Sequence, residues 1–171
     1  MEDPCLLIRN QTTSFSWVDN ILVVGNDSSK IINELKSTFK IKDLGLESHV
    51  LGMQIVQDRE NHVLINQTHY INELLKKYNM KYCKTTPTPI QINNKLEPFK
   101  DEEVDEFKKL NLDYKAAIGS LNYTSQCTHP DISYAVGHLS KFLQKPNITH
   151  WNTFKRILCY LKGTKDLGIN Y

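Results

Sequence analysis

The chain has 171 residues, of which 40% are hydrophobic and 23% charged, and its formal net charge is +2. This composition is typical of a soluble globular protein with one domain or two small ones. No apolar run approaches the roughly 20 residues of a membrane-spanning helix, and the N-terminus does not read as a signal peptide. We therefore expect an intracellular protein, cytoplasmic or nuclear and not secreted. The net charge is too small to indicate a nucleic-acid partner by itself.

Residues 5–25 predict the first part of a sheet. An apolar run at residues 5–9 could pair with a hairpin whose strands flank the polar pair Asp19-Asn20, because Asp and Asn suit a tight turn. The residues leave two interpretations open, an ordinary turn or a tip whose Asp19 carboxylate holds a divalent metal. Two-metal phosphoryl transfer needs several carboxylates, and Asn20 is uncharged, so Asp19 alone is an incomplete site.

A helix and a second hairpin are predicted next. Apolar residues at helical spacing follow the polar cluster 26–29, and Gly45 is a plausible stop. The second hairpin joins residues 49–56 to residues 62–66 through a turn at 58–61, and Gly52 inside the first strand suggests a bulge or a close backbone. A further helix is expected from Thr68 to Tyr78.

The second half of the chain is predicted to be helical. Residues 83–100 contain three prolines and read as an extended linker. Helices are expected at about 113–126, 130–143 and 149–163, and a strand begins at Gly168. No Cys or His spacing indicates a zinc site. The fold class is therefore α+β.

Basic residues give a modest case for nucleic-acid binding. Lysines follow the helix at 68–78, and Lys155, Arg156 and Lys162 lie on the last helix, where they could neutralise phosphates or form solvated faces. Gly119 and Tyr123 lie four residues apart on one helix, and their face could follow a duplex groove or pack on a neighbouring helix.

The sequence as a whole resembles the reverse transcriptase of copia-type long-terminal-repeat retrotransposons, from the middle of the palm to the edge of the ribonuclease H domain. The resemblance covers nearly the whole chain, and its blocks occur in the order of the family. They include Trp17-Val18-Asp19-Asn20, Leu51-Gly52-Met53-Gln54-Ile55, Ile118-Gly119-Ser120-Leu121-Asn122-Tyr123, His129-Pro130-Asp131-Ile132 and Tyr160-Leu161-Lys162-Gly163-Thr164.

The resemblance implies a role for each block. Asp19 matches the first aspartate of the catalytic hairpin, a ligand of Mg²⁺, and Leu51, Gly52 and Met53 match the primer grip. The helix carrying Gly119, Asn122 and Tyr123 is similar to the thumb helix that follows the minor groove of an RNA or DNA template–primer duplex. Residues 1–82 would then be a partial polymerase palm, and residues 101–171 a helical thumb and connection region beyond the linker at 83–100.

The departures from the family pattern are equally informative. The second hairpin aspartate is replaced by Asn20, and the usual tyrosine by Trp17. The other palm aspartate and the fingers would precede Met1, so an upstream palm and fingers segment is an expected partner. One carboxylate gives little hold on Mg²⁺. We expect a reverse-transcriptase segment that is inactive alone; the alternatives are a residual nucleic-acid-binding module without catalysis and a segment without selected function.

Overall fold

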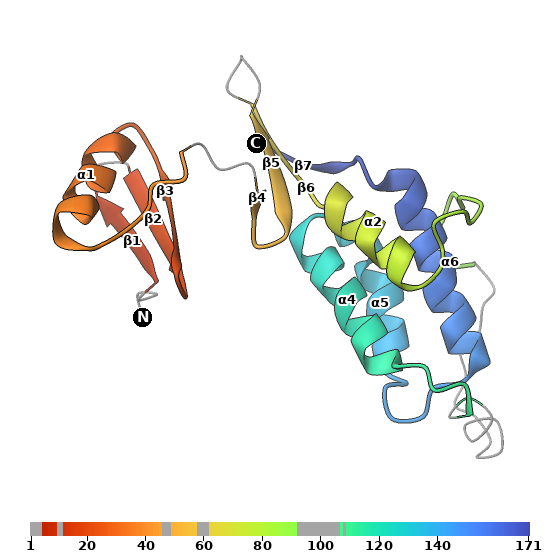
Figure 1. The fold of residues 1–171 in the computed structure, drawn as a ribbon. Helices are drawn as coiled ribbons and strands as arrows, with labels where there is room; N and C mark the ends of the chain where they lie inside the picture. Colours follow the sequence, from red (N-terminus) through yellow and green to blue (C-terminus); the bar gives the residue numbers. More distant parts are fainter. Residues whose placement is uncertain (1–4, 10–11, 46–48, 58–61, 92–106, 108) are drawn as a thin grey trace. The chain divides into compact units, whose positions relative to one another are not determined.

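The computed structural model describes residues 5–9, 12–45, 49–57, 62–91, 107 and 109–171. It divides into two compact units, Met1–Leu46 and Glu47–Tyr171. The first unit (red to orange in Figure 1) holds one sheet and one helix, and the second holds another sheet and a group of helices. The chain therefore has mixed helix and antiparallel sheet, as the α+β prediction required.

The first unit is a three-stranded antiparallel sheet with a helix. Strand β2 (Thr12–Trp17) lies between β1 (Leu6–Arg9) and β3 (Asn20–Val24), which confirms that residues 5–9 pair with the hairpin. Helix α1 (Ser28–Thr38) follows, and its cap residue Asp27 donates its backbone N–H to the Thr12 hydroxyl at 3.1 Å. This bond fixes the start of the helix against the sheet.

The turn of this hairpin is one residue earlier than the sequence predicted. Trp17 pairs with Asn20, so the two turn residues are Val18 and Asp19, and Asn20 begins β3. This register places Phe15 opposite Leu22. A cross-strand apolar pair of this kind stabilises a sheet, and a slip by one residue would move every side chain to the other face. The prediction of an Asp19-Asn20 turn was wrong because strand pairing outweighed the turn preference of Asn.

The second unit begins with another sheet. Its four antiparallel strands are, in spatial order, β4 (His49–Val50), β5 (Met53–Gln57), β6 (Val63–Asn66) and β7 (Gly168–Asn170). Strand β7 confirms the strand expected at Gly168, and it brings the last residues of the chain beside β6, as Figure 1 shows. The predicted bulge at Gly52 was wrong. Val50 pairs with Met53, so Leu51 and Gly52 are a two-residue turn between β4 and β5.

The helices of the second unit agree with the predicted periodicity. In the part of the chain that the structure describes, they are α2 (Thr68–Lys77), α4 (Tyr114–Cys127), α5 (Ser133–Ser140) and α6 (Ile148–Thr164). The predicted helix at 130–143 is a short 3₁₀ turn (Pro130–Ile132) followed by α5, which ends earlier than expected. Gly163 does not stop α6, which continues through Thr164.

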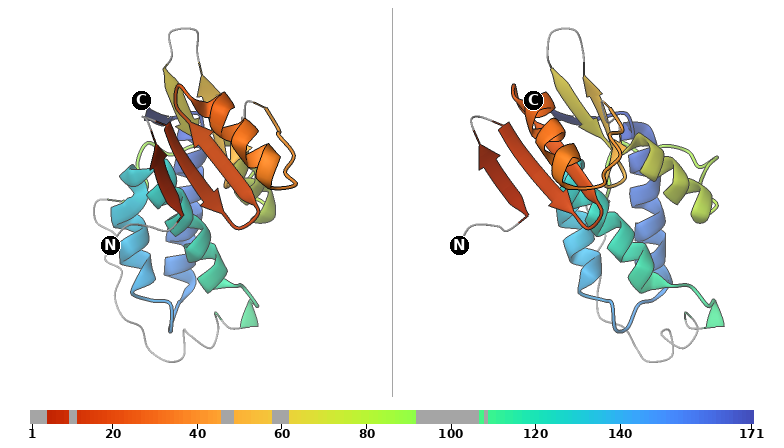
Figure 2. Two further views of the ribbon diagram at one scale, coloured as in Figure 1. Left: turned by 90° about the vertical axis from the view of Figure 1, so that its left-hand side faces the viewer. Right: turned by 60° about the vertical axis from the view of Figure 1, so that its left-hand side comes forward.

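The hydrophobic core lies among these helices. In both views of Figure 2 the blue helix α6 runs beside the lighter blue α5, and it contacts α2 and α4 as well. Large hydrophobic side chains that are fully buried come from all four helices, most of them from α6: Phe154, Ile157, Leu158 and Leu161 of α6, Ile71 of α2, Leu121 of α4, and Val136 and Leu139 of α5. The buried side chains hold the four helices in one arrangement.

Two of the predictions concern residues that the structure does not describe. The turn at 58–61 and the linker beyond residue 91 lie outside the described residues. The described part of the linker, residues 83–91, has neither helix nor strand. The domain boundaries after residues 82 and 100, and the assignment of palm, thumb and connection regions, stay predictions. Among the described helices, none is long and apolar enough to cross a membrane.

Candidate nucleic-acid interface and hairpin carboxylate

Asp19 lies at the tip of the β2–β3 hairpin. It is the second residue of the two-residue turn, and its side chain is exposed. The first turn residue, Val18, has φ +51° and is 88% exposed. A β-branched residue in the left-handed region is strained, and such strain requires support from the flanking strands. The hairpin therefore presents the Asp19 carboxylate to solvent, as the sequence predicted.

The donor set at this tip does not fit a magnesium ion by itself. Asp19 supplies a carboxylate, whereas the adjacent Asn20 supplies a neutral amide. Mg²⁺ demands near-octahedral oxygen ligation and is held by carboxylates together with substrate phosphates and water. Within the described residues, no three His, Cys, Asp or Glu side chains gather where they could hold a metal. No catalytic step through a metal is therefore derived from these residues.

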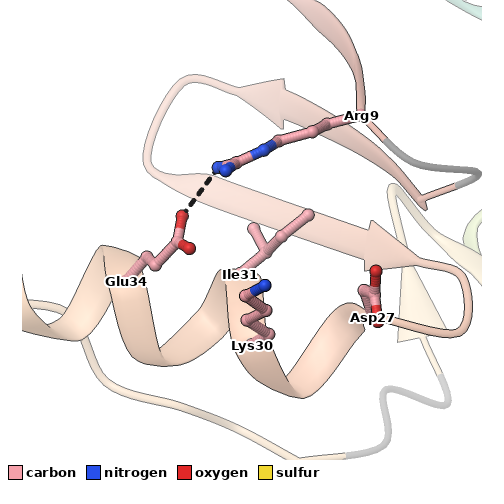
Figure 3. A pocket seen from close by; sticks show the side chains of 5 residues that line it. All are labelled: Arg9, Asp27, Lys30, Ile31 and Glu34. Atoms are coloured by element: carbon pink, nitrogen blue, oxygen red, sulfur yellow. Dashed lines mark hydrogen bonds and ion pairs between the residues drawn. The ribbon is translucent and has the colours of Figure 1, made fainter.

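A shallow pocket in the same unit lies between β1 and α1 (Figure 3). It is lined by Arg9, Asp27, Lys30, Ile31 and Glu34. Across it, the Arg9 guanidinium donates to the Glu34 carboxylate at 2.9 Å, and both side chains are largely exposed. An exposed ion pair of this kind contributes little to stability. Asp19 is not among the lining residues, so this pocket and the hairpin carboxylate are separate features.

The predicted primer-grip residues meet the predicted thumb helix. The Leu51-Gly52 turn lies against α4, where the Tyr123 hydroxyl donates to the Leu51 carbonyl oxygen. Leu51 and Gly52 have φ +51° and +76°, and a Cβ at Gly52 would lie 3.3 Å from the Tyr123 oxygen. Burial, followed by the nearby Cys127 thiol, raises the pKa of Tyr123 to about 12, so its hydroxyl remains protonated as a donor.

The three predicted residues of α4 divide into two groups. Gly119 and Asn122 are exposed, and a Cβ placed at Gly119 would meet no atom within 4 Å. Tyr123 is half-buried, and its ring packs edge-on against Tyr70 with 5.0 Å between the ring centres. Asp113 caps the helix by accepting the backbone N–H of Ala116. The open face of α4 therefore carries Gly119 and Asn122, whereas Tyr123 contacts the Leu51-Gly52 turn between β4 and β5.

The basic residues of α6 also divide. Lys162 donates its ammonium to the Cys83 carbonyl oxygen at 2.7 Å, and the Arg156 guanidinium donates to the Thr88 hydroxyl at 3.1 Å. Both bonds hold the segment that follows α2 along α6, where it is drawn in green in Figure 1. Lys155 is half-buried and makes no hydrogen bond or ion pair to another described residue. Of the three, Lys155 is the most available for an external phosphate.

Two buried histidines serve the structure. The Nδ1 atom of His150 accepts the Asn147 N–H at 3.1 Å, while the Asn147 side chain accepts the His150 N–H, which closes a capping box at the start of α6. Burial, with a smaller effect of His138, lowers the pKa of His150 to about 4. Burial also lowers the pKa of His129, although Asp131 opposes this shift. Both rings are therefore neutral at physiological pH.

Sequence comparison gives a consistent result. Residues 11–92 match the family model for reverse transcriptase (RNA-dependent DNA polymerase). The chain is 38% identical over 95% of its length to the retrovirus-related Pol polyprotein from transposon TNT 1-94 of Nicotiana tabacum. It is 35% identical over 90% of its length to that from transposon RE1 of Arabidopsis thaliana. An uncharacterized mitochondrial protein of the same plant is 33% identical over 90% of the chain.

The match covers only part of each relative. The chain spans 13% of the tobacco polyprotein, 10% of the RE1 polyprotein and 62% of the mitochondrial protein. No solved structure matches the chain.

Proposed function

This chain belongs to the reverse transcriptase family of retrotransposon Pol polyproteins, and we propose that it is a template–primer-binding part of such an enzyme that does not polymerise DNA alone. The observation that carries the proposal is the β2–β3 hairpin, which presents Asp19 beside an uncharged Asn20. Phosphoryl transfer by two metal ions requires a clamp of several anionic ligands around them. One carboxylate and one amide do not provide this clamp.

Primer extension tests the catalytic half of the proposal. The purified chain is incubated with an RNA template, a DNA primer, all four deoxynucleotides and either Mg²⁺ or Mn²⁺. We expect no more extension than the Asp19→Ala variant gives, with an active reverse transcriptase as the positive control. Template-dependent extension that Asp19→Ala abolishes would overturn the proposal.

The binding half of the proposal rests on the open face of α4. Gly119 and Asn122 are exposed there, and the space above Gly119 would admit the backbone of a duplex. Lys155 on α6 supplies a basic side chain without a partner among the described residues. These three residues support contact with a template–primer, whereas Arg156 and Lys162 contribute less because they already hold the segment at residues 83–88.

The Gly119→Ala variant tests whether the open face of α4 binds a duplex, because stability and duplex affinity should change in opposite directions. Alanine is favoured over glycine inside a helix by roughly 1 kcal/mol, and the added Cβ meets nothing in the protein. We expect the variant to be more stable yet to bind an RNA–DNA duplex more weakly. Gly137→Ala on α5 is the matched control, because it is also exposed and its Cβ would meet nothing within 4 Å. Equal duplex affinity of the two variants would contradict the proposed face.

A further inference from the structure

We propose that four lysines and one tyrosine at the end of α2 form a binding surface for single-stranded nucleic acid. We call this the Lys–Tyr surface; it consists of Lys76, Lys77, Lys81, Tyr82 and Lys84. The proposal rests on the proposed function, since it names a further contact of the same nucleic-acid-binding chain. It differs in position from the α4 face and in the form of nucleic acid that it would hold.

The end of α2 fixes the path of the backbone through this surface. Asn79 adopts φ +57°, its N–H bonds to the Lys76 carbonyl, and the Met80 N–H bonds to the Leu75 carbonyl at 2.7 Å. This pattern of bonds is the Schellman motif that ends many helices. Leu75 belongs to the buried core, and Met80 packs against the same core. The chain therefore leaves the helix in one defined direction.

A second turn then points two side chains outward. The Cys83 N–H bonds to the Met80 carbonyl at 3.1 Å, which makes Lys81 and Tyr82 the central residues of a four-residue turn. Both ends of the turn are anchored. Met80 packs on the core, and the Cys83 carbonyl accepts the Lys162 ammonium. Because the backbone is already ordered, a ligand at Lys81 and Tyr82 would bind with a reduced entropic cost.

The ring of Tyr82 is exposed enough for a nucleic-acid base to stack on it. Its side chain is 89% exposed, and the Lys81 ammonium lies 5.5 Å from its ring centre. The nearby Tyr78 behaves differently, because its ring packs edge-on against Phe154 and Trp151. The chain therefore buries one tyrosine of this stretch and leaves the other uncovered. Aromatic rings of this kind stack with nucleic-acid bases irrespective of sequence.

The charged residues next to Tyr82 in the sequence are all lysines. All four lysines are exposed, and none of them makes an ion pair with another described residue. Residues 74–96 contain no Asp or Glu. Lys76 and Lys77 lie at the negative end of the α2 dipole, which favours positive charge. This interaction accounts for the positions of these two lysines, but not for Lys81, Tyr82 and Lys84 beyond the helix. Lysines that border an aromatic ring match the alternation of phosphates and bases in a nucleic-acid strand.

The ring selects the form of the nucleic acid. In a duplex the base faces are stacked on one another, so Tyr82 could reach only phosphates and sugars. In a single strand a base can leave its neighbours and lie on the ring, while lysines contact the flanking phosphates. An acidic protein would satisfy the lysines without using the face of Tyr82. A single-stranded segment, such as an unpaired template, is therefore the ligand that uses every feature of the surface.

Fluorescence anisotropy with a labelled oligouridine of about 12 nucleotides tests the proposal on the full chain. We expect Tyr82→Ala to weaken binding by about fivefold or more, which corresponds to the loss of one stacked base, and Tyr82→Phe to retain the affinity within about twofold. Tyr134→Ala is the matched control, because Tyr134 is 73% exposed on α5. Lys81→Ala should lower the slope of log affinity against log salt by about 0.7.

Three results would overturn the proposal. They are an unchanged affinity of Tyr82→Ala, an equal loss in Tyr134→Ala, and tighter binding of poly-glutamate than of oligouridine at the same salt. The two proposals fail separately. A Gly119→Ala variant with unchanged duplex affinity counts against the α4 face alone, whereas a Tyr82→Ala variant with unchanged single-strand affinity counts against the Lys–Tyr surface alone.

Discussion

His150 makes the stability of the second unit depend on pH. Its Nδ1 accepts the Asn147 N–H, and protonation of that atom would remove the acceptor. Burial lowers its pKa to about 4, below the ordinary histidine value of about 6.5. The folded chain therefore binds fewer protons than the unfolded chain between these values. We expect full stability above about pH 6.5 and a loss on the order of 3 kcal/mol as the pH falls through 4.

Urea unfolding at several pH values between 4 and 7 measures this effect. His150→Gln keeps an acceptor at the third helical position, which suits a capping box, but does not titrate in this range. The variant should be less stable at pH 7, because its side chain does not stack on Phe142, and its stability should vary less with pH. His69→Gln is the control, because His69 is exposed. An unchanged pH dependence in His150→Gln would contradict the assignment.

Gly52 and Tyr123 are predicted to be energetically coupled. Gly52→Ala forces a side chain into the left-handed region, at a cost of roughly 1–2 kcal/mol, and places its Cβ 3.3 Å from the Tyr123 oxygen. Tyr123→Phe removes the hydroxyl that donates to Leu51, for about 1 kcal/mol. In the double variant the close contact disappears. The double variant should therefore lose less stability than the sum of the losses of the two single variants. Unfolding free energies of the four proteins give the coupling, and strict additivity would contradict it.

Residue-scale predictions from the sequence succeeded where the information was local. Asp19 at a hairpin tip follows from two strand-like runs that flank polar residues, although the observed turn is Val18-Asp19 and not Asp19-Asn20. The bond from Tyr123 to Leu51 joins residues 72 positions apart, and no periodicity or spacing connects them. The helical spacing of Gly119 and Tyr123 placed both on one face, but it could not show that the tyrosine contacts the turn between β4 and β5.

At the scale of elements, α6 serves as the support for the segment that follows α2. Lys162 and Arg156 each hold this segment by one hydrogen bond, and Gly163 allows close approach, since a Cβ there would lie 3.3 Å from Thr85. The sequence left these basic residues as either phosphate contacts or solvated helix faces, because charge spacing does not reveal a carbonyl or hydroxyl partner from another segment. Their availability to nucleic acid is therefore reduced.

Lys162→Met tests this structural use. Methionine keeps an apolar stem but loses the ammonium, so the Cys83 carbonyl loses its charged donor, and we expect a loss of about 1.5 kcal/mol or more. Hydrogen exchange should accelerate at residues 83–91, while α4 keeps its protection. Lys155→Met is the control, because Lys155 has no described partner, and it should leave exchange in that segment unchanged. Equal exchange in the two variants would show that the bond does not order the segment.

Element boundaries show where pattern reasoning was sufficient. Helices α2 and α4 have long apolar stripes, and their predicted limits differ from the observed ones by a residue or so. The β4–β5 turn was missed because Leu51 carries none of the usual turn chemistry; only Gly52 favours positive φ. The turn at Leu51 is stabilised by a tertiary contact, the hydrogen bond from Tyr123. The sequence pattern does not predict such a contact.

At the scale of the whole molecule, the two units differ in how much apolar surface they bury. Among the described residues, the second unit has 17 buried hydrophobic side chains, from Ile71 to Leu161, whereas the first unit has none. Leu7 and Ile8 on β1 are 67% and 71% exposed. Burial of apolar surface is the main favourable contribution to folding, so the structure predicts a stability gradient along the chain.

Native-state hydrogen exchange should detect this gradient. Amides of β2 and β3 are expected to show protection factors lower than those of α4 and α6 by about tenfold or more, because regions with few buried apolar contacts open at lower free energy. Ile157→Ala, which removes a fully buried side chain of α6, should cost about 2–5 kcal/mol and reduce protection in the second unit. Since Ile157 belongs to the second unit, exchange in β2 and β3 should stay unchanged. A parallel fall in both units would mean that the chain unfolds as one cooperative body, and the gradient argued from buried surface would then be wrong.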